Sequence, residues 1–116
     1  MKNLSISLKE LNTLIEQFRF EEALEKFYDE GVVTCENENP PIVGLQAYRI
    51  AAKSFAASIS NYSAELKNII LSDNMSVIEW HYIFDHQQWG HWDRYQLSVQ
   101  RWKDGKIIHE RHHYNM

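Results

Sequence analysis

The dipeptide Asp104-Gly105 joins two stretches, residues 92–103 and 106–114, that are rich in aromatic and β-branched side chains spaced by polar ones. Asp-Gly is a strong signal for the two-residue turn of a β-hairpin, because both turn positions need a positive φ that these residues tolerate. The stretches predict a strand on each side of the turn. A two-residue loop places Lys103 opposite Lys106, and this register assigns every residue of both strands to one face of the sheet.

Carried through both strands without interruption, the register gives two faces of unequal polarity. The more apolar face consists of Tyr95, Leu97, Val99, Arg101, Ile108, Glu110, His112 and Tyr114. We expect this face to meet helices and the opposite face, which contains Trp102 and Ile107, to point away from them. On the preceding predicted strand, residues 76–85, the side chains expected to face the helices are Ile78, Trp80, Tyr82 and Phe84.

The first half of the chain shows apolar residues at helical spacing instead. A first helix is predicted to begin at Ser7, because Glu10 follows three residues later and completes a capping box. A second helix is predicted over residues 20–28, and a third over residues 45–57, directly after Gly44.

Two further strands are predicted over residues 32–36 and 64–71, so helices precede an antiparallel meander of strands. This order is typical of the α+β class, with helices on one face of a sheet. A chain of 116 residues has the length of one domain. We therefore predict a single domain over residues 1–116, with three N-terminal helices packed on a curved antiparallel sheet.

The charge pattern argues against nucleic acid and membrane as partners. The formal net charge is −4, and no basic cluster is present that would neutralise several phosphates. No apolar run is long enough to span a bilayer. The lone cysteine, Cys35, follows Val32-Val33-Thr34, so we expect a buried thiol without a disulfide and a cytoplasmic location. The six histidines lack the spacing of a shared metal site, and we predict neither a metal nor another cofactor.

Glu110 and His112 form the sharpest candidate site, because they are predicted to share the helix-covered face, where a charge needs a partner or water. A histidine exchanges a proton near neutral pH, and a neighbouring carboxylate orients and charges it. Two alternatives stay open: Glu110 pairs with Arg101 in a structural role, and His112 hydrogen-bonds Tyr95 or Tyr114. Three helices over a curved sheet can also leave a cavity, which is the usual form of a ligand site.

The predicted layout resembles the SnoaL-like branch of the nuclear-transport-factor-2-like (NTF2-like) superfamily. The resemblance covers nearly the whole chain: paired N-terminal helices, a short strand, Gly44 before a third helix, and then the meander. Its most telling part is the stretch Val99-Gln100-Arg101-Trp102-Lys103-Asp104-Gly105-Lys106-Ile107-Ile108-His109-Glu110, which is similar to the last hairpin of the family. The resemblance implies a cystatin-like cone with an apolar pocket and a homodimer formed through the outer sheet face.

The resemblance also locates possible catalytic positions. His112 stands where the family's cyclases and epoxide hydrolases carry a working carboxylate, seven residues after the turn glycine. Trp80 and Tyr82 stand where the epoxide hydrolases carry an arginine and an aspartate, which argues against that reaction. For the aspartate that serves as general base in the family's isomerases, Glu36 is the nearest acidic candidate on the first strand. The alternative is that Glu36 belongs to a solvated loop.

Three functions follow as hypotheses. The first is an enzyme that moves a proton on a small apolar, ring-like metabolite through His112, with Glu110 as its orienting group and Tyr95 or Arg101 as a donor to a developing oxyanion. The second is a domain that binds such an apolar or aromatic molecule without turnover. The third is a homodimeric interaction domain with a filled interior. The predicted ligand-binding residues are Trp80, Tyr82, Tyr95, Leu97, Arg101, Tyr114 and Tyr48.

Overall fold

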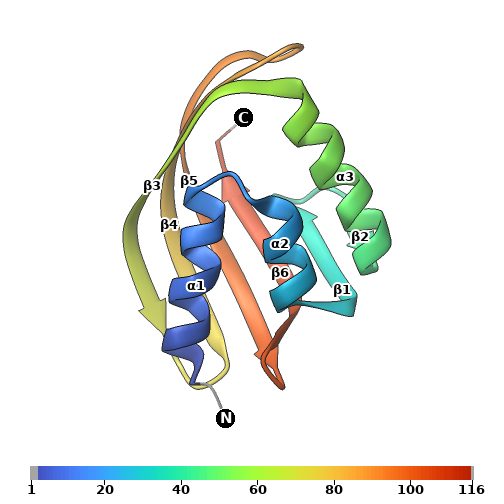
Figure 1. The fold of residues 1–116 in the computed structure, drawn as a ribbon, viewed down its shortest axis with the longest axis vertical. Helices are drawn as coiled ribbons and strands as arrows, with labels where there is room; N and C mark the ends of the chain where they lie inside the picture. Colours follow the sequence, from blue (N-terminus) through green and yellow to red (C-terminus); the bar gives the residue numbers. More distant parts are fainter. Residues whose placement is uncertain (1–2, 116) are drawn as a thin grey trace.

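The computed structural model describes residues 3–115, which form an α+β domain in which three helices pack against one six-stranded sheet (Figure 1). The elements in chain order are α1 (Leu4–Glu16), α2 (Phe20–Phe27), β1 (Tyr28–Glu36), β2 (Ile42–Val43), α3 (Leu45–Ser58), β3 (Ile59–Leu71), β4 (Met75–His86), β5 (Gly90–Lys103) and β6 (Lys106–Tyr114). The predicted α+β class is therefore confirmed.

The strand order across the sheet is β2-β1-β6-β5-β4-β3. Strands β3 to β6 form the predicted antiparallel meander. The prediction of a wholly antiparallel sheet is wrong, because β1 pairs with β6 in parallel and the sheet is mixed. The pairing partner of a strand early in the chain depends on where the last strand of the meander arrives, and no local pattern encodes that.

Helix boundaries agree closely with the sequence except at the start of α1. Asn3 caps this helix, with its side-chain oxygen accepting from the backbone N–H of Ile6 at 3.0 Å. The predicted cap, Ser7, instead lies inside the helix and is buried. The capping-box spacing is present in the sequence, but Asn3 is an equally good cap one turn earlier and is the one used.

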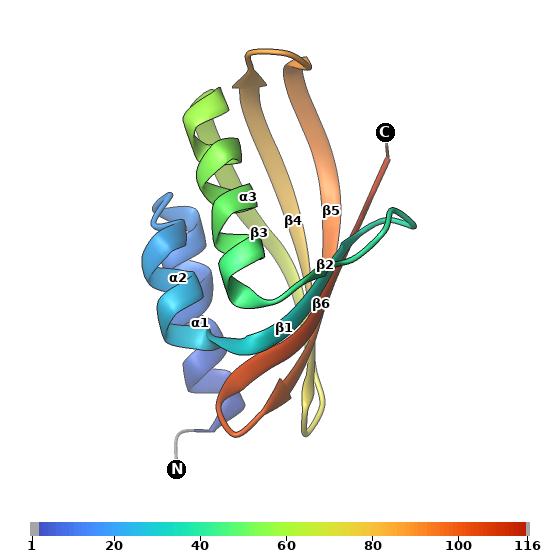
Figure 2. The same ribbon diagram turned by 90° about the vertical axis from the view of Figure 1, so that its right-hand side faces the viewer.

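Figure 2 shows α1, α2 and α3 on the same side of the sheet, leaving its other side uncovered by helices. The core lies between α1, α2 and the sheet, where side chains such as Leu8, Leu11, Ile78 and Ile107 are almost inaccessible to solvent. Burying one such side chain contributes about 1.5–3 kcal/mol. Cys35 is buried, as expected from its apolar surroundings. None of the helices within residues 3–115 has the length and apolar character needed to cross a membrane.

The hairpin of β5 and β6 contains a β-bulge that sequence analysis missed. Lys103 pairs with Lys106 and Trp102 with Ile107, as predicted, but Arg101 then pairs with His109. Ile108 is therefore an extra residue in β6, and from this point on the register differs by one from the uninterrupted prediction. Both turn residues have positive φ, +52° at Asp104 and +79° at Gly105, as the two-residue turn requires.

The bulge reverses the predicted face of β5 and leaves that of the second half of β6 unchanged. Glu110, His112 and Tyr114 face the helices, as predicted. The prediction is wrong for Tyr95, Leu97, Val99 and Arg101, which lie on the outer face, and also for Trp102 and Ile107, which are buried in the core. Uninterrupted alternation would leave Trp102 and Ile107 in water. The extra residue lets both ends of the hairpin bury their bulky side chains.

Candidate functional site

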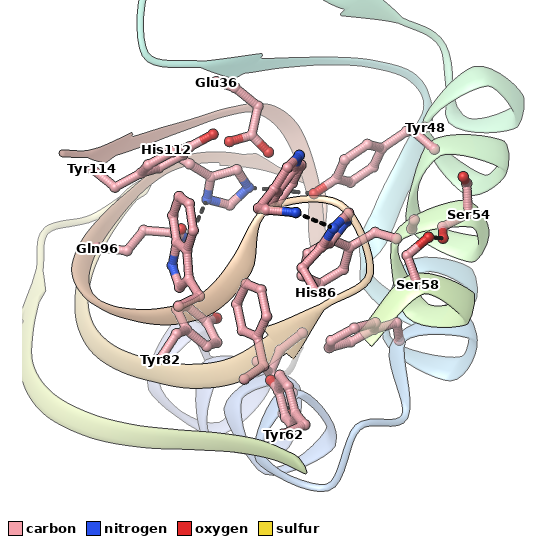
Figure 3. A pocket seen from close by; sticks show the side chains of 18 of the residues that line it. Glu36, Tyr48, Ser54, Ser58, Tyr62, Tyr82, His86, Gln96, His112 and Tyr114 are labelled. Carbon is pink, nitrogen blue, oxygen red and sulfur yellow. Dashed lines mark hydrogen bonds between the residues drawn. The ribbon is translucent and has the colours of Figure 1, made fainter. Parts of the chain in front are cut away.

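A cavity of about 550 Å³ lies between the sheet and the helices, with α3 along one side and residues of α1 and α2 at its edge (Figure 3). Ten of its 23 lining residues are Phe, Tyr or Trp, namely Phe20, Tyr28, Tyr48, Phe55, Tyr62, Tyr82, Phe84, Trp89, Trp92 and Tyr114. The polar lining residues include Glu36, His86, Gln96 and His112. The volume is in the range that holds a drug-sized or metabolite-sized molecule.

The helix α3 forms one wall of this cavity. Its apolar face carries Tyr48, Ala52 and Phe55 at helical spacing, yet none of its residues is fully buried. The small side chains of Ala51 and Ala52 leave space between this helix and the sheet. The apolar face of α3 therefore borders the cavity and is not packed tightly against the sheet.

The carboxylate of Glu110 is 1% exposed and lies behind the cavity wall. Among the described residues, four groups lie within hydrogen-bonding distance of it. Its Oε2 accepts from the Tyr28 hydroxyl at 2.6 Å and from the Gln100 amide at 2.7 Å. Its Oε1 lies 3.1 Å from both the Tyr48 hydroxyl and the Nε2 of His112. A carboxylate with four partners is satisfied in its ionised form, which makes its burial tolerable.

The orientation of the Gln100 amide is settled by a chain of donors behind it. The indole N–H of Trp102 donates to Ser76 Oγ at 2.9 Å. The Ser76 hydroxyl in turn donates to the carbonyl oxygen of Gln100 at 2.6 Å. This leaves the Gln100 NH₂ group to face Glu110. These hydrogen bonds fix a donor for the carboxylate with Ser76 of β4 and two residues of β5, Gln100 and Trp102, that the bulge turns inward.

His112 connects this buried network to the cavity. Its Nδ1 lies 2.8 Å from Ser98 Oγ and 3.2 Å from the Gln96 amide nitrogen, while its Nε2 lies 3.3 Å from the Tyr48 hydroxyl. In the neutral ring an unprotonated Nδ1 accepts from the Gln96 amide, and Nε2 carries the proton toward Glu110. In the charged ring Nδ1 is protonated as well, and the Ser98 hydroxyl oxygen at 2.8 Å can accept from it. Tyr48, Gln96 and His112 all line the cavity.

Burial and charge act in opposite directions on this pair. Burial disfavours the imidazolium, but the charge and the hydrogen bond of Glu110, together with the charge of Glu36, outweigh it and raise the pKa of His112. Burial likewise disfavours the Glu110 carboxylate, but the charge of His112 and the hydrogen bonds from His112, Tyr28 and Gln100 hold the pKa of Glu110 below its ordinary value. The geometry thus favours an ion pair.

Glu36 adds a second carboxylate to the same end of the cavity. It sits opposite His112 in the parallel pairing of β1 and β6, and it lines the cavity (Figure 3). The pKa of the neighbouring Tyr114 hydroxyl is raised, mainly by burial and also by the hydrogen bond and the charge of the Glu36 carboxylate. Of the two alternatives that the sequence left open for Glu36, the structure favours the cavity position over a solvated loop.

The structure gathers only part of the predicted ligand-binding set. Tyr48, Tyr82 and Tyr114 line the cavity together with His112. Trp80 is buried in the core and stacks on Tyr82 with ring centres 5.6 Å apart, so it supports the wall without lining it.

The expected cavity positions of Tyr95, Leu97 and Arg101 are wrong, because the bulge turns these residues to the outer face. The alternative pair of Glu110 with Arg101 fails for the same reason. The predicted oxyanion donors, Tyr95 and Arg101, are thereby removed from the cavity. Tyr48, Gln96 and Ser98 occupy the positions around His112 instead.

Sequence analysis missed the polar partners on β5 and the aromatic end of the cavity. Gln96, Ser98 and Gln100 alternate along β5 and would have been found by allowing one bulge beside the turn. Trp89 lies in the β4–β5 turn, where a loop residue has no periodicity to reveal its direction, whereas Trp92 lies near the start of β5. Within residues 3–115, no group of three His, Cys, Asp or Glu side chains is placed to hold a metal ion.

Solved structures match the chain over nearly its whole length. A candidate SnoaL-like polyketide cyclase from Mesorhizobium loti superposes with a TM-score of 0.83 at 18% identity, over 96% of this chain and 98% of that one. An NTF2-like protein of unknown function from Burkholderia pseudomallei also gives 0.83, at 11% identity over 99% and 92%. A candidate polyketide cyclase from Xanthomonas campestris pv. campestris gives 0.78, at 16% identity over 96% and 89%.

No protein-family model matches the sequence, and no curated protein matches it by sequence similarity. The structural matches show that the chain has the NTF2-like fold in the form shared with SnoaL-like proteins, as the resemblance in its sequence predicts. At these identities the likeness concerns the fold, and the reaction has to be argued from the site.

Proposed function

We propose that this protein binds a small, flat, largely apolar molecule in the cavity under α3 and moves a proton on it through His112, without a cofactor. The observation that carries the proposal is the position of His112, whose imidazole lines an aromatic cavity while its Nε2 contacts a fully buried carboxylate. An imidazole held in this way can give and take a proton near neutral pH.

Each polar group at this end of the cavity has a distinct part. Glu110 acts through His112 as a positioning residue, since it is buried behind the wall and favours the charged ring. The contact of Tyr48 with Nε2 is the longest at His112, at 3.3 Å, so a ligand oxygen entering between them replaces the weakest bond. The Tyr48 hydroxyl donates to Glu110 in the free protein and would turn its one proton from Glu110 to a developing oxyanion on the ligand, a part that sequence analysis gave to Tyr95 or Arg101. Isomerisation and cyclisation next to a carbonyl are reactions of this type.

One observation favours a second candidate, a binding domain without turnover. Both ring nitrogens of His112 already contact protein groups, Glu110 and Tyr48 on one side and Ser98 and Gln96 on the other. A histidine with all its hydrogen bonds made can serve structure alone. The two candidates share the ligand and differ only in turnover.

A deuterium-exchange experiment distinguishes the enzyme from the binding domain. We expect the wild-type protein in D₂O to speed deuterium incorporation next to the carbonyl of 2-tetralone, a flat ring ketone, above the buffer rate when followed by mass spectrometry. A His112→Gln variant should lose about 10²-fold or more of that rate, the usual contribution of one general acid–base group. His113→Gln, which changes an exposed histidine on the outer face, is the matched control.

Thermal stabilisation is measured in parallel, because a bound ligand raises the melting temperature whether or not it reacts. If 2-tetralone stabilises the protein but deuterium exchange stays at the buffer rate, the enzyme hypothesis is contradicted and the binding-domain hypothesis stands. Neither stabilisation nor exchange would contradict both.

A further inference from the structure

A second histidine of the cavity, His86 at the end of β4, is not used by the proton chemistry proposed above. Its side chain lines the cavity and the residue is only 8% exposed. In Figure 3 its ring lies beside α3, whereas the ring of His112 lies beside β6. The two imidazoles therefore enter the cavity from different walls.

The hydrogen bonds of His86 settle which of its nitrogens carries the proton. Its Nδ1 accepts from two backbone N–H groups of the β4–β5 turn, that of Gln88 at 3.0 Å and that of Trp89 at 3.2 Å. A backbone N–H can only donate, so Nδ1 must be unprotonated in this arrangement. The proton of the neutral ring is consequently on Nε2, which leaves an N–H donor at the second nitrogen.

This Nε2–H donor has no acceptor among the described residues of the protein. The neighbours of the ring are aromatic: Trp89 stacks on it with ring centres 3.7 Å apart and planes 5° from parallel, and Phe55 lies 6.2 Å away. Ser58, a polar lining residue on α3, directs its own hydroxyl to the Ser54 carbonyl at 2.8 Å. The donor opens on the cavity, where an acceptor atom of a ligand can take its hydrogen bond.

The aromatic groups around His86 define where such a ligand lies. The rings of Trp89 and Trp92 are 5.5 Å apart, and Phe84 lies edge-on to Phe55 at 5.2 Å. These side chains form an apolar chamber around the Nε2–H. The chamber suits the face of a ring and rejects a ligand that brings a second donor or a cation to this point.

We propose that His86 is a specificity-determining residue that donates a hydrogen bond from Nε2 to an oxygen or nitrogen acceptor on the ring end of the ligand farther from His112. The inference rests on the proposed ligand-binding function and narrows it to ring compounds with two polar points. One is the carbonyl or hydroxyl that meets Tyr48 and His112, and the other is an acceptor held against the Trp89 stack by His86.

Two isosteric probes test this assignment: 6-acetyl-2-naphthol, which carries a hydroxyl for Tyr48 and His112 and a carbonyl acceptor for His86, and 6-isopropenyl-2-naphthol, in which a CH₂ group replaces the carbonyl oxygen. We expect wild-type protein to bind the ketone about fivefold more tightly in a tryptophan-fluorescence titration, the gain from one net hydrogen bond. His86→Phe keeps the stack on Trp89 but lacks the N–H, and it should bind both probes equally. His113→Phe, on the outer face, should keep the preference.

A measurement on the wild-type protein covers the case in which His86→Phe fails to fold. Long-range ¹H–¹⁵N NMR spectra, with His86 assigned through its bonds, should show the Nε2–H tautomer, and the Nε2 signal should shift with the ketone and not with the alkene. An Nδ1–H tautomer, equal binding of both probes by wild type, or a preference that survives in His86→Phe overturns the assignment while cavity binding stands. Failure of both probes to bind overturns the cavity function as well.

Discussion

At the scale of single residues, Glu110 and His112 show how a buried charge is made tolerable. Glu110 is one of the most deeply buried side chains of the described chain, and it is surrounded by donors from three strands and one helix. Losing any one partner leaves a desolvated charge short of a hydrogen bond, which costs more than the bond contributes when made. The network therefore holds the imidazole in one place and favours its charged form.

This ion pair should make the stability of the protein depend on pH on both sides of a plateau. The pKa of Glu110 lies below its ordinary value of 4.5, so its contribution is complete above pH 4.5 and is lost as the pH falls through the folded-state pKa. The pKa of His112 lies above its ordinary value of 6.5, so its contribution is complete below pH 6.5 and is lost as the pH rises through the folded-state pKa.

Urea denaturation across pH 3–9 checks this prediction. The difference in unfolding free energy between wild type and His112→Gln should be largest between about pH 4.5 and 6.5 and should shrink on either side. Glu36 and Tyr48 also face His112, so Glu36→Gln serves as a control for the second carboxylate. A difference that grows steadily above pH 7 would contradict the raised pKa of His112.

At the scale of elements, the hairpin of β5 and β6 decides what the cavity contains. The turn at Asp104-Gly105 sets the register, and the bulge at Ile108 then shifts it by one. The shift places Gln96, Ser98 and Gln100 beside Glu110 and His112, whereas an uninterrupted hairpin would offer Leu97, Val99 and Arg101. One inserted residue thereby supplies the polar partners that a buried ion pair needs.

The turn itself can be tested through its backbone conformation. Gly105 has a φ of +79°, a region in which a Cβ atom is strained, and we expect Gly105→Ala to lower the free energy of unfolding by about 1–2 kcal/mol. Gly31→Ala is the matched control. Gly31 is exposed and is not among the glycines with positive φ, and a Cβ there would meet only the side chain of Asp29 at 3.4 Å. It should change stability by less than about 0.5 kcal/mol. Equal losses in the two variants, measured by chemical denaturation, would argue against the strained turn.

At the scale of the whole molecule, the two faces of the sheet have different surroundings. All helices of the described chain cover one side of the sheet, where the core and the cavity lie (Figure 2). The other side exposes apolar groups, with Tyr95 56% and Leu97 41% accessible. Glu79 on β4 and Arg101 on β5 bring both charge signs to this face. A face with apolar groups and both signs of charge can pair with a copy of itself across a two-fold axis.

We expect the protein to form a homodimer through this outer face, as sequence analysis proposes. Light scattering coupled to gel filtration should give a mass near twice 13.8 kDa. The double substitution Tyr95→Glu and Leu97→Lys should shift the mass toward the monomer, because it places charges in the apolar part of the interface. Ile6→Lys, on the exposed side of α1, is the control and should leave the mass unchanged. A wild-type mass near 13.8 kDa at high protein concentration would contradict the dimer.

Much of the fold can be derived from local patterns in the sequence. Periodicity locates the helices and strands, Gly44 marks the start of α3, and Asp104-Gly105 predicts the hairpin with its first two residue pairs. The sequence also predicts the inward positions of Glu110, His112 and Tyr114, although the apolar β5 residues that favoured this face, Tyr95, Leu97 and Val99, point outward. These features depend on residues within one turn or one hairpin, where propensity and side-chain spacing decide.

Other features depend on contacts between distant parts of the chain, and only the tertiary structure decided them. The bulge at Ile108 exists because Trp102 and Ile107 gain more from burial than an even ladder would provide, which depends on the helices that cover them. The parallel pairing of β1 with β6 and the donors that Tyr28 and Tyr48 supply to Glu110 join residues more than 60 positions apart. Local sequence thus determined which elements form, and the competition for burial between elements determined which side chains share the cavity.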